Sequence, residues 1–208
     1  MAIKVRSVVS EDWQDVKRIY EAGIETKMAT FESKAPESYD EWFGEANPQC
    51  SFVAYEEIHI LGWCKLSPVS KRNVYKGVGE VSIYIDTHAK GKGIGDLLLK
   101  HMIIASEKEG FWTLESKIFK ENVASLNLHI KNGFRVVGVR EKIAQLDGIW
   151  KDNVLLEKRN SFNSDIKKFI RWNVSINSHD EKKHDEYEKL AKKVRVSFNK
   201  KFYNEKNK

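Results

Sequence analysis

The stretch that decides how this chain is organised is residues 80–95, EVSIYIDTHAKGKGIG. In its first half, Val81, Ile83 and Ile85 alternate with other residues, and this period of two is typical of a β-strand. A turn with three glycines follows, and an apolar periodic run over residues 94–109 then predicts a helix. The expected order is therefore strand, glycine-rich turn, helix.

The glycine-rich turn has the chemistry of an anion-binding site. The first N–H groups of a helix have no partner inside the helix, and the helix dipole is positive there. Glycines adopt positive φ and let a phosphate approach the backbone, while Lys90 and Lys92 add positive charge. Two nucleotide motifs do not fit, because no Ser or Thr follows a Gly-Lys and Leu98 replaces the third dinucleotide glycine. A plain turn between strand and helix is the alternative interpretation.

The rest of the chain up to Lys158 predicts an α/β or α+β fold with one mixed sheet. Strands are expected at residues 3–8, 51–55, 60–67, from 80 onward, 113–119, 134–140 and 149–158. Helices are expected at residues 11–25, from 38 onward, at 94–109 and from 122 onward. Ser10 is expected to cap the first helix, and Ser38 with Glu41 forms a capping-box pattern for the second.

Charge divides the chain into two parts. The formal net charge is +6, and residues 160–208 hold 13 Lys and Arg against 7 Asp and Glu, so the whole excess lies there. We therefore expect a domain at residues 1–159 and a basic extension at 160–208. The extension is interpreted first as a packing or dimer arm, with a strand near 170–176 and an amphipathic helix near 187–198. Nucleic-acid or ribosome binding through it and a loosely attached helix are the less favoured interpretations.

Other features narrow the class of protein. No apolar run is long enough for a transmembrane helix, and no secretory signal is evident, so we expect a cytoplasmic protein without membrane association. Cys50 and Cys64 are expected to be reduced thiols in the structure. The six histidines do not cluster at metal-ligand spacing, and no G-x-S-x-G elbow is present, so neither a metalloenzyme nor a serine hydrolase is expected.

The glycine-rich turn resembles the acetyl-CoA loop of the GCN5-related N-acetyltransferase (GNAT) superfamily, [QR]-x-x-G-x-[GA], with Lys90 in place of Arg or Gln. The resemblance implies a mixed, mostly antiparallel sheet flanked by helices, with acetyl-CoA as cosubstrate. The residues that it implies for cofactor binding in this stretch are Ile83, Tyr84, Ile85, Lys90, Gly91, Lys92, Gly93, Ile94 and Gly95.

A second GNAT-like motif lies at residues 120–134, KENVASLNLHIKNGF, which fits N-x-x-[AS]-x-x-[LFY]-[YH]-x-x-x-G-F. The resemblance implies that Asn122 and Ser125 contact the cofactor. It also implies that His129, where Tyr is commoner, protonates the departing thiolate. Without this motif, His129 would be interpreted as an ordinary helix-surface histidine.

Three further segments resemble the phosphinothricin acetyltransferases within this superfamily. They are Thr30-Phe31, the segment Ser67-Pro68 with Arg72, Tyr75 and Glu80 at matching spacing, and Gly148–Asp152. Val69 and Ser70 depart from the subfamily pattern, which weakens the identification of the acceptor more than that of the reaction.

Acetyl transfer to an amine requires a group that accepts the amine proton, and Glu80 is the candidate base. The alternative is an ordinary carboxylate at a strand edge. Arg72 and Tyr75 are candidates for binding an acceptor carboxylate, although Arg72 also fits a solvated loop charge. Phe31 is interpreted as a wall of the substrate pocket or as a core aromatic residue.

These observations favour an acetyl-CoA-dependent N-acetyltransferase that acts on a primary amine of a small molecule, an amino acid or an analogue of the phosphinothricin or methionine sulfoximine type. A homodimer is expected from the same resemblance. Two alternatives stay open. One is an enzyme that acetylates protein or ribosomal N-termini, and the other is a non-catalytic protein that binds CoA or nucleic acid.

Overall fold

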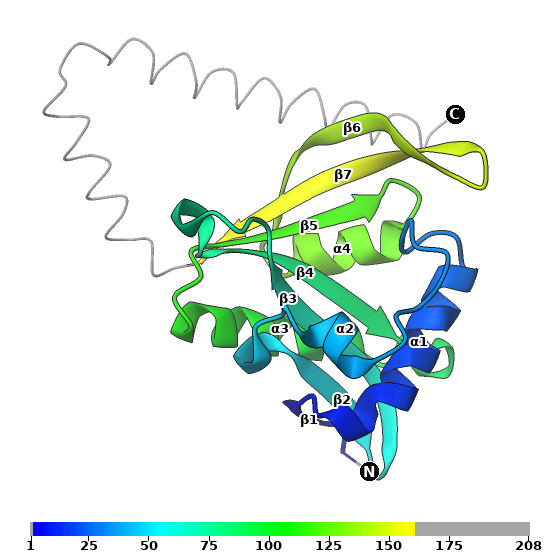
Figure 1. Cartoon of the computed structure of the whole chain (residues 1–208), viewed down its shortest axis with the longest axis vertical. Helices are drawn as coiled ribbons and strands as arrows, with labels where there is room; N and C mark the ends of the chain where they lie inside the picture. The colour runs from blue at the N-terminus through cyan, green and yellow to red at the C-terminus, as the bar shows by residue number, and fades with distance from the viewer. Residues whose placement is uncertain (1, 161–208) are drawn as a thin grey trace, which may run out of the picture. The chain divides into compact units, whose positions relative to one another are not determined.

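The structure is a computed structural model, which describes residues 2–160 of the 208-residue chain. The strand and helix expected near residues 170–176 and 187–198 lie outside the described residues. Within residues 2–160, one sheet runs through the whole fold and helices cover both of its faces (Figure 1).

The sheet has seven strands in the order β1-β2-β3-β4-β5-β7-β6. All neighbouring strands are antiparallel except β4 and β5, which are parallel. The mixed, mostly antiparallel sheet expected from the sequence is therefore confirmed. The strand bounds are β1 Lys4–Ser7, β2 Phe52–Glu56, β3 His59–Pro68, β4 Val78–Ile85, β5 Thr113–Phe119, β6 Arg135–Leu146 and β7 Ile149–Arg159.

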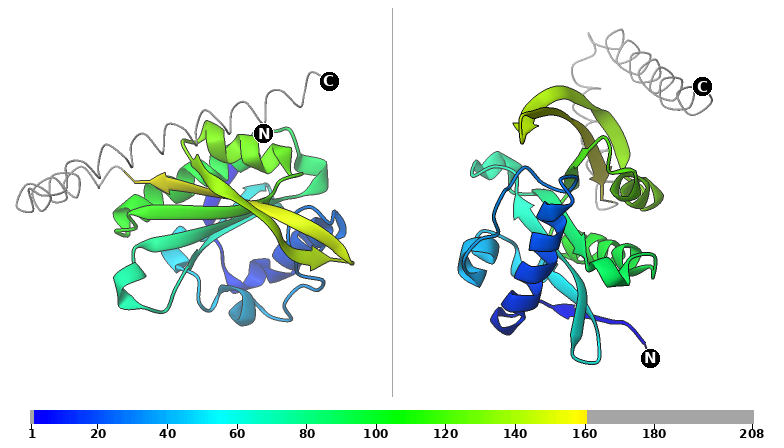
Figure 2. Two further views of the ribbon diagram at one scale, coloured as in Figure 1. Left: turned by 90° about the horizontal axis from the view of Figure 1, so that it is seen from above. Right: turned by 90° about the vertical axis from the view of Figure 1, so that its right-hand side faces the viewer.

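The helices form two layers, one on each face of the sheet, as Figure 2 shows. Helices α1 and α2 lie on one face, and α3 and α4 lie on the other. Their bounds are α1 Trp13–Glu25, α2 Tyr39–Phe43, α3 Ile94–Lys108 and α4 Val123–Lys131. Helix α3 follows directly from the glycine-rich turn after β4, as the sequence predicts.

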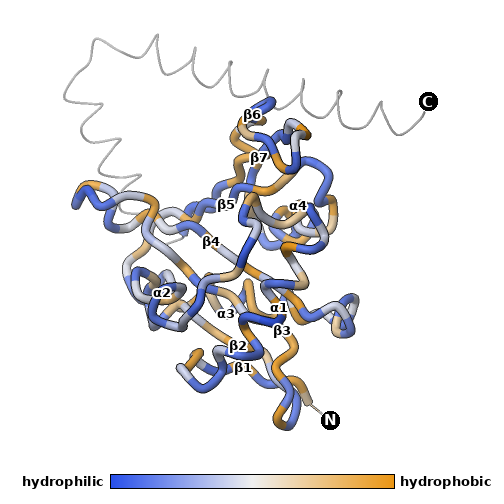
Figure 3. Tube along the Cα trace, turned by 45° about the vertical axis from the view of Figure 1, so that its right-hand side comes forward, coloured by the Kyte–Doolittle hydropathy of each residue, from blue (hydrophilic) through white to orange (hydrophobic). Residues whose placement is uncertain are grey.

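Each face of the sheet has its own hydrophobic core, because the β-strands alternate the direction of their side chains. Leu98 and Met102 of α3 pack against Leu66 on one face, whereas Val16 of α1 packs near Trp63 on the other. All of these residues are fully buried. Figure 3 shows hydrophobic and hydrophilic residues interspersed along the strands and helices.

The start of α1 corrects one prediction from the sequence. Ser10 does not cap this helix, since it begins a single 3₁₀ turn, and α1 starts at Trp13. Asp12 occupies the N-cap position of α1 but makes no side-chain cap hydrogen bond to it, because its carboxylate reaches back and accepts the backbone N–H of Val9 at 2.9 Å. A bidentate contact with Arg6 holds that carboxylate in place.

The predicted capping box of α2 is only half formed. Ser38 Oγ accepts the N–H of Glu41 at 3.2 Å, as expected for a helix N-cap. The carboxylate of Glu41 accepts the N–H of Glu37 rather than that of Ser38.

The last two strands are longer than predicted and form a hairpin around a turn at Asp147-Gly148. Both turn residues have positive φ, 50° and 77°, which suits a tight two-residue hairpin turn. Asn160 follows β7 and is buried, and its side-chain amide donates to Ser106 Oγ and to the carbonyl of Phe111, both at 2.9 Å. These contacts tie Asn160 to the end of α3 and to the segment that follows it.

Among residues 2–160, no helix is long and apolar enough to cross a membrane. The same part of the chain contains no group of three or more His, Cys, Asp or Glu placed to hold a metal ion. Cys50 and Cys64 are buried and form no disulfide. Burial raises the pKa of the Cys50 thiol to about 12, so this thiol is unreactive near neutral pH.

Candidate active site

The site begins where β4 and β5 separate. These parallel strands are paired only from Val78 to Glu80 on β4 and from Thr113 to Glu115 on β5. Strand β4 nevertheless stays paired with β3 as far as Ile85, and β5 stays paired with β7 as far as Phe119. The facing edges of the two strands are therefore free of each other beyond Glu80, and backbone groups there are available to a ligand.

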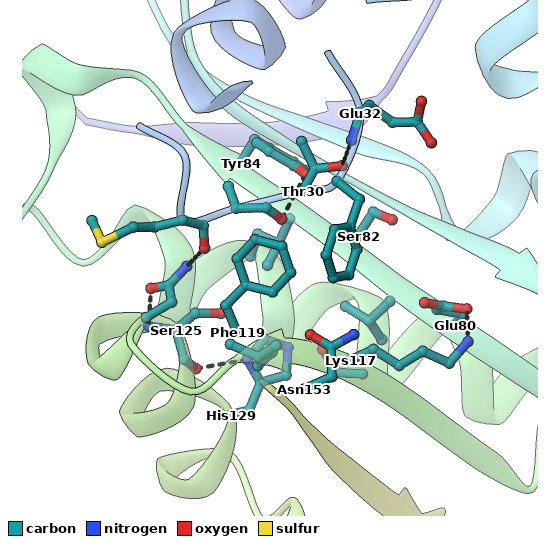
Figure 4. A pocket seen from close by; sticks show the side chains of 18 of the residues that line it. Thr30, Glu32, Glu80, Ser82, Tyr84, Lys117, Phe119, Ser125, His129 and Asn153 are labelled. Carbon is teal, nitrogen blue, oxygen red and sulfur yellow. Dashed lines mark hydrogen bonds and ion pairs between the residues drawn. The ribbon is translucent and has the colours of Figure 1, made fainter. Parts of the chain in front are cut away.

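A cleft of about 320 Å³ occupies this separation (Figure 4). Its walls come from β4, β5, α4 and the loop after α1, with single contributions from α1, α2 and β7. The lining residues are Tyr20, residues 28–32, Trp42, residues 80–84, residues 116–119, Asn122, Ser125, His129 and Asn153. The structure thus brings together Glu80, His129 and Phe31, which the sequence placed in the site from separate motifs.

Glu80 lies in the cleft wall at the point where the strands begin to separate. Its Oε2 is 2.5 Å from the Nζ of Lys117 on β5, and both side chains are about one-third exposed, at 33% each. Figure 4 shows this ion pair at one end of the cleft. Because Glu80 is accessible from the cleft, its carboxylate can meet an incoming amine.

His129 of α4 lines the cleft and is only 1% exposed. Its Nδ1 lies 2.8 Å from the carbonyl of Ser125, and a carbonyl can only accept a hydrogen bond. Nδ1 therefore carries the proton. Burial lowers the pKa of His129 below its ordinary value, so the ring is neutral at pH 7. The second ring nitrogen, Nε2, then carries a lone pair, and it has no hydrogen-bond partner among the described residues.

The loop that follows α1 is fastened to the cleft by three contacts. Asn122 Nδ2 donates to the backbone carbonyl of Met28 at 3.1 Å. The hydroxyl of Tyr84 donates to the backbone carbonyl of Ala29 at 3.3 Å. Phe31 packs edge-on against Phe119, with ring centroids 4.5 Å apart. Phe31 therefore forms part of the wall.

Asn122 also has a structural role at the start of α4. Its Oδ1 accepts the N–H of Ser125 and so caps α4. Both ends of this amide are thus engaged within the protein, while the proposed contacts of Asn122 and Ser125 with a cofactor stay predictions.

The glycine-rich turn lies beyond the cleft-lining residues, at the end of β4. Gly91 and Gly93 both have φ of 79°, a conformation that side chains other than glycine rarely adopt. Gly93 is the N-cap of α3 and supplies no side chain, so the first N–H groups of this helix lack a side-chain cap. Lys90 and Lys92 are exposed beside them. These features fit a group of bound phosphates.

The last two positions of the motif serve packing as well. Ile94 is 1% exposed and belongs to the core, so only its backbone can reach a ligand. A Cβ at Gly95 would come within 3.0 Å of Leu128, and glycine therefore lets α3 approach α4 closely.

The structure does not place the predicted acceptor-binding pair among the residues that line the cleft. Arg72 and Tyr75 are exposed in the connection between β3 and β4, where the guanidinium lies 5.7 Å from the Tyr75 ring centroid. Binding of the acceptor by these two residues stays a prediction.

Several polar residues of the cleft were not predicted as site residues from the sequence, among them Trp42, Lys117 and Asn153. Trp42 Nε1 and Asn153 Oδ1 are buried atoms without a hydrogen-bond partner among the described residues. The alternation of residues 113–119 could have indicated Lys117, since it places Lys117 on the same face as Glu115, the register partner of Glu80. No local signal marks Trp42 or Asn153.

Comparison with known families agrees with this geometry. A profile of the acetyltransferase (GNAT) family matches residues 13–134, which is more than half of the chain. The chain therefore belongs to the GNAT family and is an N-acetyltransferase.

Within that family, the chain is similar to phosphinothricin acetyltransferases, as its sequence motifs predicted. YwnH of Bacillus subtilis (strain 168), which carries a provisional name as a phosphinothricin acetyltransferase, is 33% identical over 148 residues, 69% of this chain and 91% of that protein. The phosphinothricin N-acetyltransferase of Streptomyces coelicolor is 29% identical over 163 residues, 75% of this chain and 95% of that protein.

A crystal structure with the same fold is that of a phosphinothricin acetyltransferase from Sinorhizobium meliloti in complex with AcCoA. It superposes with a TM-score of 0.70 at 24% identity and covers 77% of this chain and 89% of its own.

Proposed function

We propose that this enzyme transfers the acetyl group of acetyl-CoA to the primary amine of a small molecule, an amino acid or an analogue of the phosphinothricin or methionine sulfoximine type. The observation that carries the proposal is the cleft between β4 and β5, which holds an accessible carboxylate, Glu80, and a neutral buried imidazole, His129. The names of its relatives support the same acceptor class.

Acetyl-CoA, the cosubstrate of the GNAT family, supplies an activated acyl group and a thiolate leaving group. The residues of this chain fit it in two places. The free edge of β4 beyond Glu80 offers backbone groups of Ile83 and Ile85 to an extended amide chain. The turn at Gly91 and Gly93, with the uncapped start of α3, suits the pyrophosphate.

Two protons leave the amine nitrogen during acetyl transfer, and the cleft provides a separate acceptor for each. The acceptor amine is mainly an ammonium at neutral pH, and Glu80 takes the first proton so that the nitrogen lone pair becomes available. As the amide forms, the nitrogen loses a second proton, which His129 accepts at Nε2 and passes to the departing sulfur.

His129 thus begins the reaction as a proton acceptor. This order differs from the simple donor role that the sequence motif implied, because Nδ1 already holds the only ring proton against the Ser125 carbonyl. The outcome at the sulfur is the same, since the thiolate still receives its proton from this histidine.

A thiol-release assay with acetyl-CoA tests the proposal. The acceptor panel should include phosphinothricin, methionine sulfoximine, common amino acids, simple amines and peptides with a free N-terminus. We expect turnover with amino acids or their analogues that stops when either acetyl-CoA or the acceptor is omitted. Turnover with peptides alone would favour an N-terminal acetyltransferase, and absence of turnover with every acceptor would contradict the proposed function.

A further inference from the structure

The cleft has a marked shortage of positive charge for a site that would bind an amino acid. Among the residues that line it in the described part of the chain, Lys117 is the only lysine or arginine. His129 is neutral, and the two acidic residues of the lining are Glu32 and Glu80. An anionic group of a substrate in this cleft would therefore have one full positive charge to bind.

Lys117 lies where a positive charge could bind the anionic group of a substrate. It lies on β5 beyond the last residue paired with β4, and its ammonium is 2.5 Å from Glu80 Oε2. One third of each side chain is exposed, so neither charge is sealed off by the protein. An ammonium has three N–H donors, and the single contact with Glu80 leaves Lys117 able to bind a second anion.

The pair Glu80–Lys117 is complementary to a zwitterion. A free α-amino acid carries an ammonium and a carboxylate on the same carbon, so its two charges lie a few ångström apart. The ammonium would meet Glu80, which is the proposed base, and the carboxylate would meet Lys117. Charge-assisted contacts of this kind are stronger than neutral hydrogen bonds and fix the orientation of the ligand.

The predicted alternative for this role is less well placed. Arg72 lies in the exposed connection between β3 and β4, its guanidinium stacks near Tyr75, and neither residue lines the cleft. We therefore propose that Lys117 binds the carboxylate of the acceptor and makes this enzyme selective for free α-amino acids and their analogues. This inference rests on the proposed function, because it assigns the acceptor specificity of the same cleft.

The test compares two acceptors that differ only in the carboxylate, an amino acid that the wild-type enzyme acetylates and its C-terminal amide. Wild-type enzyme, Lys117→Met, Lys117→Arg and Arg72→Met are assayed with both. For Lys117→Met we expect kcat/KM for the acid to fall by about 10- to 100-fold more than for the amide, the range of a charged hydrogen bond. Lys117→Arg should retain part of the preference for the acid, and Arg72→Met should keep all of it.

Loss of Lys117 can also weaken Glu80 as a base, but that effect lowers kcat/KM for the acid and the amide alike, because both amines need the same base. Comparing the two losses therefore isolates the contact with the carboxylate. Lys71→Met, at a lysine whose side chain is 88% exposed, is the matched surface control. Thermal unfolding of each variant shows whether it is folded, and Lys117→Gln replaces Lys117→Met if the latter is not.

The outcomes separate the two proposals. Equal losses for acid and amide in Lys117→Met, or a preference lost in Arg72→Met instead, would overturn the role of Lys117 while leaving the acetyltransferase intact. A wild-type enzyme that acetylates the acid and the amide equally well would also overturn the role of Lys117. A wild-type enzyme without turnover on any amine would remove the proposed function and this inference with it.

Discussion

Replacing Glu80 with Gln is the most direct perturbation of the proposed chemistry. Gln keeps the shape of the side chain and can still contact Lys117, but it cannot accept a proton at neutral pH. A general base typically contributes 10²–10⁴-fold, so kcat should fall by roughly that factor, equivalent to about 3–5 kcal/mol in the activation free energy. The loss should be largest near pH 7, where the acceptor amine is mainly protonated.

The structure predicts that the same change has little effect on stability. The pair with Lys117 is one-third exposed on both sides, and ion pairs in contact with water usually contribute less than about 1 kcal/mol. The free energy of unfolding of Glu80→Gln should therefore stay within about 1 kcal/mol of wild type. A large loss of activity with an unchanged unfolding transition would identify lost chemistry rather than lost structure.

The assay is the pH profile of kcat/KM from pH 6 to 9, measured by thiol release for wild type, Glu80→Gln and Glu115→Gln. Glu115 is the matched control, because it lies directly beside Glu80 in the register of β4 and β5 but does not line the cleft. Glu80→Gln should recover partly as the pH approaches the pKa of the acceptor amine, whereas Glu115→Gln should resemble wild type throughout. If Glu80→Gln matches wild type over the whole range, Glu80 is a structural carboxylate and the proton goes elsewhere.

Three further predictions follow from buried polar groups. Because burial lowers the pKa of His129, the unfolded chain binds more protons below about pH 6.5, so the free energy of unfolding of wild type should fall with acidification there. His129→Phe should lower kcat and should reduce this loss of stability at acid pH, measured by urea unfolding at several pH values. An unchanged loss of stability would show that another group causes it. Burial lowers the pKa of Lys65 from 10.5 to about 8, so between pH 8 and 10.5 this residue should add about 3 kcal/mol to the free energy of unfolding, seen in chemical denaturation as a stability difference between wild type and Lys65→Met that grows with pH. Asn160→Ala removes two buried hydrogen bonds and should cost about 2 kcal/mol in urea unfolding, whereas a change below about 0.5 kcal/mol would mean that the fold ends earlier.

The central unit of the fold was predictable from its own residues. The strand before Asp86 follows from side chains that alternate within one segment, and the turn follows from glycines, which adopt the positive φ found at Gly91 and Gly93 far more readily than other residues. These are local properties, fixed by residues a few positions apart. The motif around His129 likewise begins with an Asn cap and ends at a glycine of positive φ, so its helix was predictable from its own residues.

Local signals at the start of α1 were less reliable, because a competing group further along the chain decided the outcome. Ser10 has the side chain of a good N-cap, yet Asp12 reaches back to the Val9 N–H and Arg6 holds it there. The carboxylate of Asp12 therefore closes the 3₁₀ turn before α1, and α1 itself begins without a side-chain cap.

The contents of the cleft, in contrast, depend on how distant segments pack together. Lys117 meets Glu80 across 37 positions of sequence, because β5 follows β4 in parallel register before the two strands separate. The burial that keeps His129 neutral depends on how α4 packs, and the position of Arg72 outside the cleft depends on the path of a long connection. Sequence patterns report the conformation of one segment at a time, whereas the charge and protonation of a site depend on which distant segments the sheet brings together.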